Sequence, residues 1–266
     1  MVNSESNQYE AGSGKAFLRT TGLTKRFGEF TAVARVDLAV DRGEFRSVIG
    51  PNGAGKTTLF NLISGAMTPT EGTITLSGTD ITDLSPAERV GANLARSFQL
   101  TTVFNGRSVR ENLRVAAQAR EFGGMSAAQR LFADPDGFEG INGRTDAVLD
   151  DLGLRSVADA QASDLSYGDR RRLEVGLVLA TDPEVVLLDE PTAGMSGDET
   201  EATIALFEDV LAEQTVVLVE HNVDLVMRVS DRITTLNAGQ IVATGTPEEI
   251  AADDRVRDAY LGGYTA

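Results

Sequence analysis

The sequence predicts an α/β fold with a parallel sheet at its core, an antiparallel β subdomain and an inserted helical subdomain. Two observations predict it. Short apolar runs alternate with helical patterns through 44–63 and 184–220, as in βαβ units. A mostly helical stretch from about 100 to 164 interrupts that alternation. We expect a mobile, polar tail over 1–15, one domain over 16–246 and a helical extension over 247–266.

A glycine-rich loop separates the strand pattern at 44–49 from the helical pattern at 57–63 and fits the motif G-x-x-x-x-G-K-[ST]. Its glycines let successive N–H groups point at phosphate oxygens, and the helix N-terminus adds a positive dipole end. We therefore predict a P-loop NTPase core, in which Lys56 reaches the β- and γ-phosphates and the Thr57 hydroxyl ligates Mg²⁺. The alternative, a turn beside a solvated lysine, is disfavoured by the flanking strand and helix. The predicted phosphate-binding residues are Gly50, Pro51, Asn52, Gly53, Ala54, Gly55, Lys56, Thr57 and Thr58.

Composition narrows the chemistry. The chain has 266 residues, no cysteine and one histidine, which excludes disulfides and thiolate metal sites and disfavours a histidine-built zinc site. No apolar run approaches the roughly 18 residues that span a bilayer, and the start of the chain is too polar for a signal peptide, so we expect a protein made in the cytosol. Catalysis is left to carboxylates, lysine, hydroxyls and backbone groups.

The charge balance is strongly acidic. With 24 basic and 40 acidic side chains the net charge is −16, which argues against a nucleic-acid partner because a polyanion needs a basic surface. Only three residues are lysines, and we interpret this composition as an adaptation to a high-salt cytoplasm, where salt screens the self-repulsion. An ordinary acidic protein is the alternative.

The N-terminal part predicts paired strands. Alternating apolar residues at 16–19 and 32–40 indicate the strands, and 24–28 is expected to be a turn with Phe27 at its tip. An exposed aromatic near a nucleotide site can stack on adenine, or it can serve packing alone. Further strands are expected at 72–76 and up to 96–99, with a short helix opening at Pro86. Within the helical stretch, Ser108 and Glu111 form a capping-box pattern.

The apolar run that begins at 184 ends in two carboxylates, Asp189 and Glu190. A central parallel strand would bring Asp189 and Glu190 to the carboxyl edge of the sheet, near the phosphate loop. There Asp189 suits Mg²⁺ coordination, and Glu190 suits orienting or deprotonating an attacking water. Exposed carboxylates at a strand end are the alternative. The pattern before this strand, in which Ser166 precedes a long helix, is on its own an ordinary N-cap.

The remaining chain completes the sheet. A helix is predicted at 198–207 and a strand at 215–220, and the only histidine, His221, follows that strand. A lone histidine is more often structural, but a loop at the carboxyl edge is where phosphate sensors lie in open α/β sheets. The strands 232–236 and 240–244 predict a hairpin, and the last residues are helical.

Taken together, the motifs resemble the ATP-binding cassette (ABC) ATPases over about 16–261: phosphate loop, glutamine loop, the signature L-S-x-G, acidic strand and histidine loop occur in that family's order. The resemblance implies that Phe27 stacks on adenine, that Gln99 ligates Mg²⁺ and couples the site to the helical subdomain, and that Asp189 also holds Mg²⁺. It further implies that Glu190 is the general base and that His221 contacts the γ-phosphate.

The resemblance also implies a sandwich dimer, in which Ser166 and Gly168 bind the γ-phosphate of the ATP on the opposite cassette. Two departures stand out: Tyr167 and Asp169 replace a glycine and a glutamine of the commonest signature, and the loop 193–196 lacks the usual leucine-aspartate ending. The extra carboxylate puts the geometry at Asp169 in question.

The segments 96–99, 165–174, 189–195 and 245–262 look like the ATPase subunits of branched-chain amino-acid importers. That subfamily implies a second cassette, integral-membrane permeases, an extracytoplasmic substrate-binding protein and a location on the cytoplasmic face of the membrane. The alternatives are a lipid or polysaccharide exporter, which the C-terminal ending disfavours, and a soluble cassette acting on ribosomes or DNA, which usually has two cassettes or a coiled-coil insertion. A binding module without turnover is disfavoured because Lys56, Asp189, Glu190 and His221 are all present.

Overall fold

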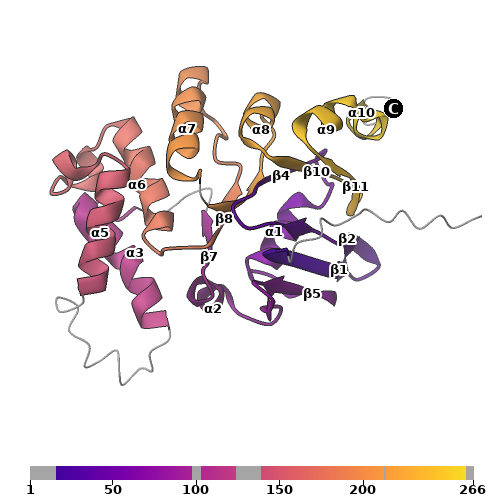
Figure 1. The fold of residues 1–266 in the computed structure, drawn as a ribbon, viewed down its shortest axis with the longest axis horizontal. Helices are drawn as coiled ribbons and strands as arrows, with labels where there is room; N and C mark the ends of the chain where they lie inside the picture. Colours follow the sequence, from indigo (N-terminus) through magenta and orange to yellow (C-terminus); the bar gives the residue numbers. More distant parts are fainter. Residues whose placement is uncertain (1–15, 98–102, 124–138, 213, 262–266) are drawn as a thin grey trace, which may run out of the picture.

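The computed structural model describes residues 16–97, 103–123, 139–212 and 214–261. They form an α/β architecture of two sheets with helices packed on them (Figure 1), so the predicted fold class is confirmed. Gln99 lies outside the described residues. No helix in the described ranges is long and apolar enough to cross a membrane.

The larger sheet is six-stranded and mostly parallel. Its strands, in spatial order, are β11 (Gln240–Gly245), β10 (Arg232–Asn237), β4 (Phe45–Ile49), β9 (Thr215–Val219), β8 (Val185–Asp189) and β7 (Leu94–Ser97). Only β11 runs antiparallel to its neighbour, as the predicted hairpin requires. Every residue of β9 is buried, because helices cover both faces of the central strands.

Helices cover the two faces unequally (Figure 1). On one side lie α7 (Gly197–Val210), α8 (Val223–Val229), α9 (Pro247–Ala252) and α10 (Asp254–Leu261). On the other, α1 (Lys56–Ile63) packs between the two sheets, where Leu59 and Phe60 are fully buried. Capping boxes begin α7 at Ser196 and α9 at Thr246, because each N-cap is followed three residues later by glutamate.

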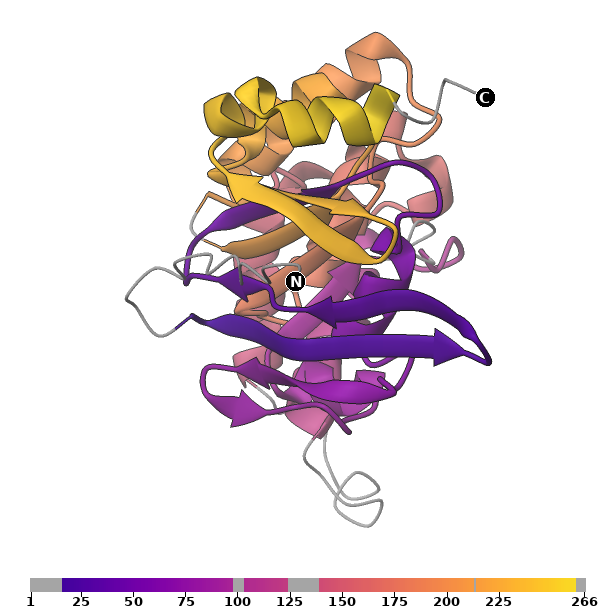
Figure 2. The ribbon, with the colours of Figure 1, turned by 90° about the vertical axis from the view of Figure 1, so that its right-hand side faces the viewer.

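The second sheet is antiparallel and carries β1 (Leu18–Phe27), β2 (Phe30–Val36), β3 (Ala39–Val40), β5 (Glu71–Leu76) and β6 (Thr79–Asp80) (Figure 2). The turn predicted at 24–28 is wrong. β1 continues through Phe27, which pairs with Phe30, and the turn lies at Gly28 and Glu29. Register shifts in β1, together with Gly22 at a φ of +58°, let the strand continue through the predicted turn.

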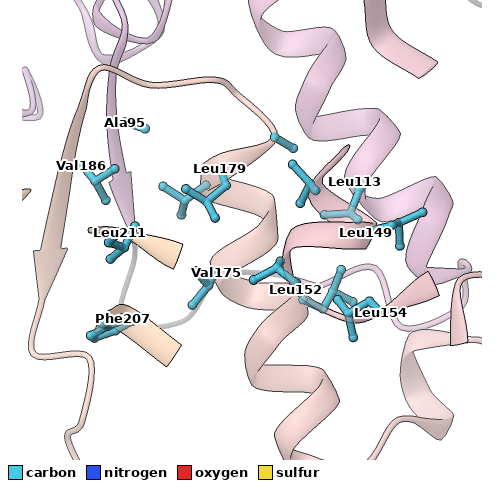
Figure 3. Packing of buried hydrophobic residues seen from close by; sticks show 14 of the residues in the cluster. Ala95, Leu113, Leu149, Leu152, Leu154, Val175, Leu179, Val186, Phe207 and Leu211 are labelled. Carbon is cyan, nitrogen blue, oxygen red and sulfur yellow. The ribbon is translucent and has the colours of Figure 1, made fainter. Parts of the chain in front are cut away.

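The helical part contains α2 (Pro86–Gly91), α3 (Val109–Gly123), α5 (Glu139–Asp151), two short 3₁₀ helices (Arg155–Val157 and Ala162–Asp164) and α6 (Tyr167–Leu179). The predicted capping box is present: the backbone N–H of Glu111 donates to the Ser108 hydroxyl at 3.1 Å, and the Ser108 N–H donates to the Glu111 carboxylate at 2.8 Å. Figure 3 shows Val175 and Leu179 of α6 between Val186 of the sheet and the helical residues around Leu113, so one apolar cluster joins the helices to the sheet.

Candidate active site

The site forms where the central parallel strands end. Because β4, β9 and β8 are neighbours and parallel, the segments that follow them meet at one edge of the sheet. A cavity of about 260 Å³ lies there, and residues 52–58 of the phosphate loop, Glu190 and His221 line it. Its lining residues are Phe30, Ala32, Asn52, Gly53, Ala54, Gly55, Lys56, Thr57, Thr58, Glu190 and His221.

Two glycines of the loop are required by close backbone approach. Gly50 has a φ of +153° and Gly55 a φ of +102°, conformations that side chains disfavour. A Cβ atom at Gly50 would lie 2.1 Å from the carbonyl oxygen of Leu236, and one at Gly55 would lie 2.4 Å from that of Ala32. The backbone of the loop therefore packs directly against the backbones of β10 and β2, with no room for a side chain at either glycine.

Lys56 opens α1 and folds back over the loop. It is 6% exposed, and its Nζ donates to the carbonyl oxygens of Gly50 at 2.7 Å and Pro51 at 3.1 Å. Burial lowers the pKa of Lys56, opposed by the nearby Glu190 carboxylate. Because the N-cap residue Gly55 has no side-chain acceptor, the first-turn N–H groups of α1 are left to bind an anion.

Glu190 and His221 face one another across this cavity. The imidazole Nε2 of His221 lies 3.0 Å from Oε1 of Glu190, and a carboxylate can only accept, so Nε2–H donates. Glu190 has a φ of +46°, rare for a residue with a side chain and held here because its N–H donates to the carbonyl of Val219 at 2.8 Å. Such strain costs about 1–3 kcal/mol and is concentrated at functional sites.

The Asp189 carboxylate points to a partner that the sequence reasoning missed. Its Oδ2 accepts from Arg96 at 2.6 Å, and both side chains are 14% exposed. Arg96 also donates to Asn61 at 2.7 Å and Ser64 at 3.0 Å, so it connects the end of β8 to α1. The parallel pairing of β7 with β8 brings the residues at their ends together, and no pattern in the sequence shows that pairing.

The oxygen donors at this edge fit a magnesium ion only with help from a ligand. In the described ranges no group of three or more histidine, aspartate or glutamate side chains could hold a metal. Thr57 lines the cavity, whereas Asp189, at the end of β8, is not among the lining residues. Mg²⁺ commonly binds through one or two protein ligands and substrate phosphates, so these residues suit an ion that arrives with a nucleotide.

Two aromatic residues lie near the tip of the β1–β2 hairpin. Phe27, the predicted adenine contact, is 48% exposed, and the Lys25 ammonium lies 5.4 Å from its ring centroid. Phe27 is not among the residues that line the cavity, whereas Phe30 is, with 65% of its surface exposed. The sequence reasoning missed Phe30 because it placed the turn before that residue.

Ser166 and Gly168 lie away from this cavity. They line a separate, open groove of about 980 Å³ between α5, α6 and α7. Ser166 caps α6, accepting from the Asp169 N–H at 3.2 Å, while its hydroxyl donates to the Asp169 carboxylate at 2.7 Å. Within one chain the phosphate loop and this serine therefore belong to different surfaces.

Comparison with known proteins identifies the family. The model of the ABC transporter family matches residues 33–193, and the model of the branched-chain amino acid ATP-binding cassette transporter matches 240–266. The high-affinity branched-chain amino acid transport ATP-binding protein LivG of Salmonella typhimurium is 40% identical over 248 residues, which cover 92% of this chain and 97% of that protein.

The corresponding protein BraF of Pseudomonas aeruginosa is 38% identical over 93% of this chain and 98% of its own length. A solved ATP-binding cassette of an ABC transporter, in its ADP conformation, superimposes with a TM-score of 0.80 at 31% identity, covering 94% of this chain and all of that one. The chain therefore belongs to the ABC transporter family, as an ATP-binding cassette with ATPase activity.

Proposed function

We propose that this cassette hydrolyses ATP to energise import of branched-chain or related amino acids, on the cytoplasmic face of the cell membrane. Hydrolysis is supported by the cavity that joins the phosphate loop, Glu190 and His221. The cargo class is supported by the 38–40% identity to proteins named for branched-chain amino acid transport and by the match of 240–266 to a model of that name.

In this proposal the loop residues and the α1 N-terminus bind the phosphates, and Lys56 leaves its carbonyl contacts to neutralise them. Thr57, Asp189 and Gln99 would hold Mg²⁺, which would neutralise charge on the phosphate oxygens. Glu190 orients and deprotonates the attacking water. His221, whose Nε2 lies 3.0 Å from Glu190, moves its Nε2–H from that carboxylate to the γ-phosphate when the nucleotide binds.

The position of the signature serine supports a second cassette as partner. Ser166 and Gly168 are separated from this chain's own phosphate loop, so their proposed ligand is the γ-phosphate on a second cassette. To bind a phosphate there, the Ser166 hydroxyl must give up its bond to the Asp169 carboxylate, which carries the same sign of charge as the phosphate, and donate to the phosphate instead. The cassette pair would drive integral-membrane permeases, and through them respond to an extracytoplasmic substrate-binding protein.

Copurification tests the proposal. A tagged Glu190→Gln variant is expressed in the native host. Mg-ATP is then added, the membranes are solubilised gently, and the proteins that copurify with the tagged chain are identified. We expect multi-span permeases and a second cassette, and the host lacking this chain should lose uptake of labelled leucine. Glu201→Gln, at an exposed position on α7, is the matched control and should restore that uptake. Recovery with ribosomes or DNA-repair proteins, and unchanged leucine uptake in the deletion strain, would contradict the transport role.

A further inference from the structure

Glu220 is a buried carboxylate that none of the motifs assigns. It follows the last residue of β9 directly, and 4% of its surface is exposed. Glutamate is almost never fully buried unless its charge is met by partners, because transfer from water is costly. Its position between β9 and His221 places it at the same sheet edge as the phosphate loop.

Four donors meet the two oxygens of this carboxylate. Oε1 accepts from the Thr192 N–H at 3.0 Å and from the Thr192 hydroxyl. Oε2 accepts from the N–H of His221 at 2.6 Å and of Asn222 at 3.2 Å. All four contacts are donors, so the acceptor-only carboxylate satisfies them without leaving a buried N–H unpaired.

These contacts connect two loops that the proposed reaction uses. Thr192 lies two residues after Glu190, and the second pair of donors includes the backbone of His221 itself. The side chains of Glu190 and His221 meet at 3.0 Å on the cavity side, while Glu220 joins the same two loops from within the protein. Three links thus hold the two loops together: the Glu190–His221 pair, the Glu190 N–H bonded to the carbonyl of Val219, and the Glu220 carboxylate.

We propose that Glu220 is a positioning residue for ATP hydrolysis: it holds the loop after β8 to the loop after β9, so that Glu190 and His221 keep one geometry at the γ-phosphate. The inference rests on the proposed roles of those two residues. Glu220 touches no residue of the phosphate loop through the four contacts described, so it should govern turnover rather than nucleotide affinity. A displacement of about 1 Å in a catalytic group can cost a hundredfold in rate.

The residue type is specific for this arrangement. Glutamine has the same shape, but one of its two oxygen positions becomes an NH₂ group, which donates. That group would face either the two donors of Thr192 or the backbone N–H groups of His221 and Asn222, so glutamine can satisfy only one of the two pairs. The Thr192 hydroxyl gives an independent probe, because Thr192→Val removes one donor and retains the backbone contact.

The test is a double-mutant cycle in steady-state ATP hydrolysis, measured on the cassette assembled with its membrane partners. Glu220→Gln should lower kcat by about tenfold or more and leave KM for Mg-ATP within about twofold. Thr192→Val should lower kcat by about threefold, and the double variant should lose less than the product of the two single effects, because the hydroxyl acts through that carboxylate. Glu201→Gln, on the surface, is the control and should resemble the wild type.

An unchanged kcat in Glu220→Gln, a rise in KM that parallels the fall in kcat, or multiplicative effects in the double variant would each overturn the inference. Glu190→Gln is assayed alongside. If that variant hydrolyses ATP normally, the proposed function itself fails, whereas a dead Glu190→Gln beside an unaffected Glu220→Gln refutes only the role of Glu220.

Discussion

Replacing the buried Arg89 by methionine should destabilise the fold by about 3 kcal/mol. Arg89 is 1% exposed, and its guanidinium donates to the carbonyls of Leu62 (2.6 Å) and Ile63 (2.5 Å) at the end of α1 and of Thr82 (2.8 Å) and Leu84 (3.0 Å) before α2. Burial lowers its pKa, opposed by nearby acidic side chains. It is the C-terminal anchor of the helix that begins at the phosphate loop.

The magnitude follows from two opposing effects. Each bond from a charged donor contributes about 1.5–3 kcal/mol, so four give roughly 6–12 kcal/mol. Methionine recovers the several kcal/mol that desolvating a guanidinium costs, which leaves a net loss of about 3 kcal/mol or somewhat more. At about 2–4 °C per kcal/mol for a chain of this size, the melting temperature should fall by roughly 6–12 °C.

The assay is thermal unfolding followed by circular dichroism, with urea titration as a second measure. Arg26→Met is the matched control, because the Arg26–Glu71 pair is about half exposed on each side and such pairs contribute at most about 1 kcal/mol. A melting temperature for Arg89→Met within 2 °C of the Arg26→Met value would refute the reasoning, since it would mean that the four carbonyls gain nothing net from the guanidinium.

Further predictions concern ligand binding and salt. Lys56→Ala should weaken ATP binding by about tenfold or more in equilibrium titration, because it removes the buried cation of the loop; unchanged affinity would exclude a phosphate contact. Phe30→Ala should weaken ATP binding more than Phe27→Ala, because Phe30 lines the cavity and Phe27 does not. The reverse order would favour Phe27, the adenine contact that the family resemblance implies. Dialysis from molar KCl into dilute buffer should cost activity and helicity, because −16 charges then repel with little screening; full activity at low salt would contradict a high-salt origin.

The sequence predicted the central sheet well because buried parallel strands appear as continuous apolar runs. The strand predicted from the run that begins at 184 contains β8 (Val185–Asp189), and the one predicted at 215–220 is β9 (Thr215–Val219) with a single residue removed. The hairpin β10–β11 could be predicted equally well from the turn between its strands, in which Ala238 and Gly239 both have a positive φ. Local chemistry was sufficient for these elements.

Local chemistry failed where distant segments decide the outcome. The extension of β1 to Phe27 depends on pairing with β2 and on register shifts that no local pattern shows. The Arg96–Asp189 pair and the four donors around Glu220 join segments that only the sheet order brings together. Glu220 could be suspected from a charge at the end of an apolar strand, but its partners could not.

The positions of Lys56, Glu190 and His221 at one cavity were within reach of the sequence, because parallel strands end at the same edge. The separation of Ser166 from that cavity was implied only by the family resemblance. The domain boundaries at 15, 246 and about 100–164 stay predictions.

The most direct test of the account is the chemical identity of the nucleotide held by the assembled complex after incubation with Mg-ATP. Wild-type complex, rapidly desalted and extracted, should contain ADP, whereas the Glu190→Gln complex should retain intact ATP, because nucleotide binding survives and the attacking water lacks its base. ADP in both complexes at equal rates would contradict the assignment of Glu190 and, with it, the proposed hydrolytic site.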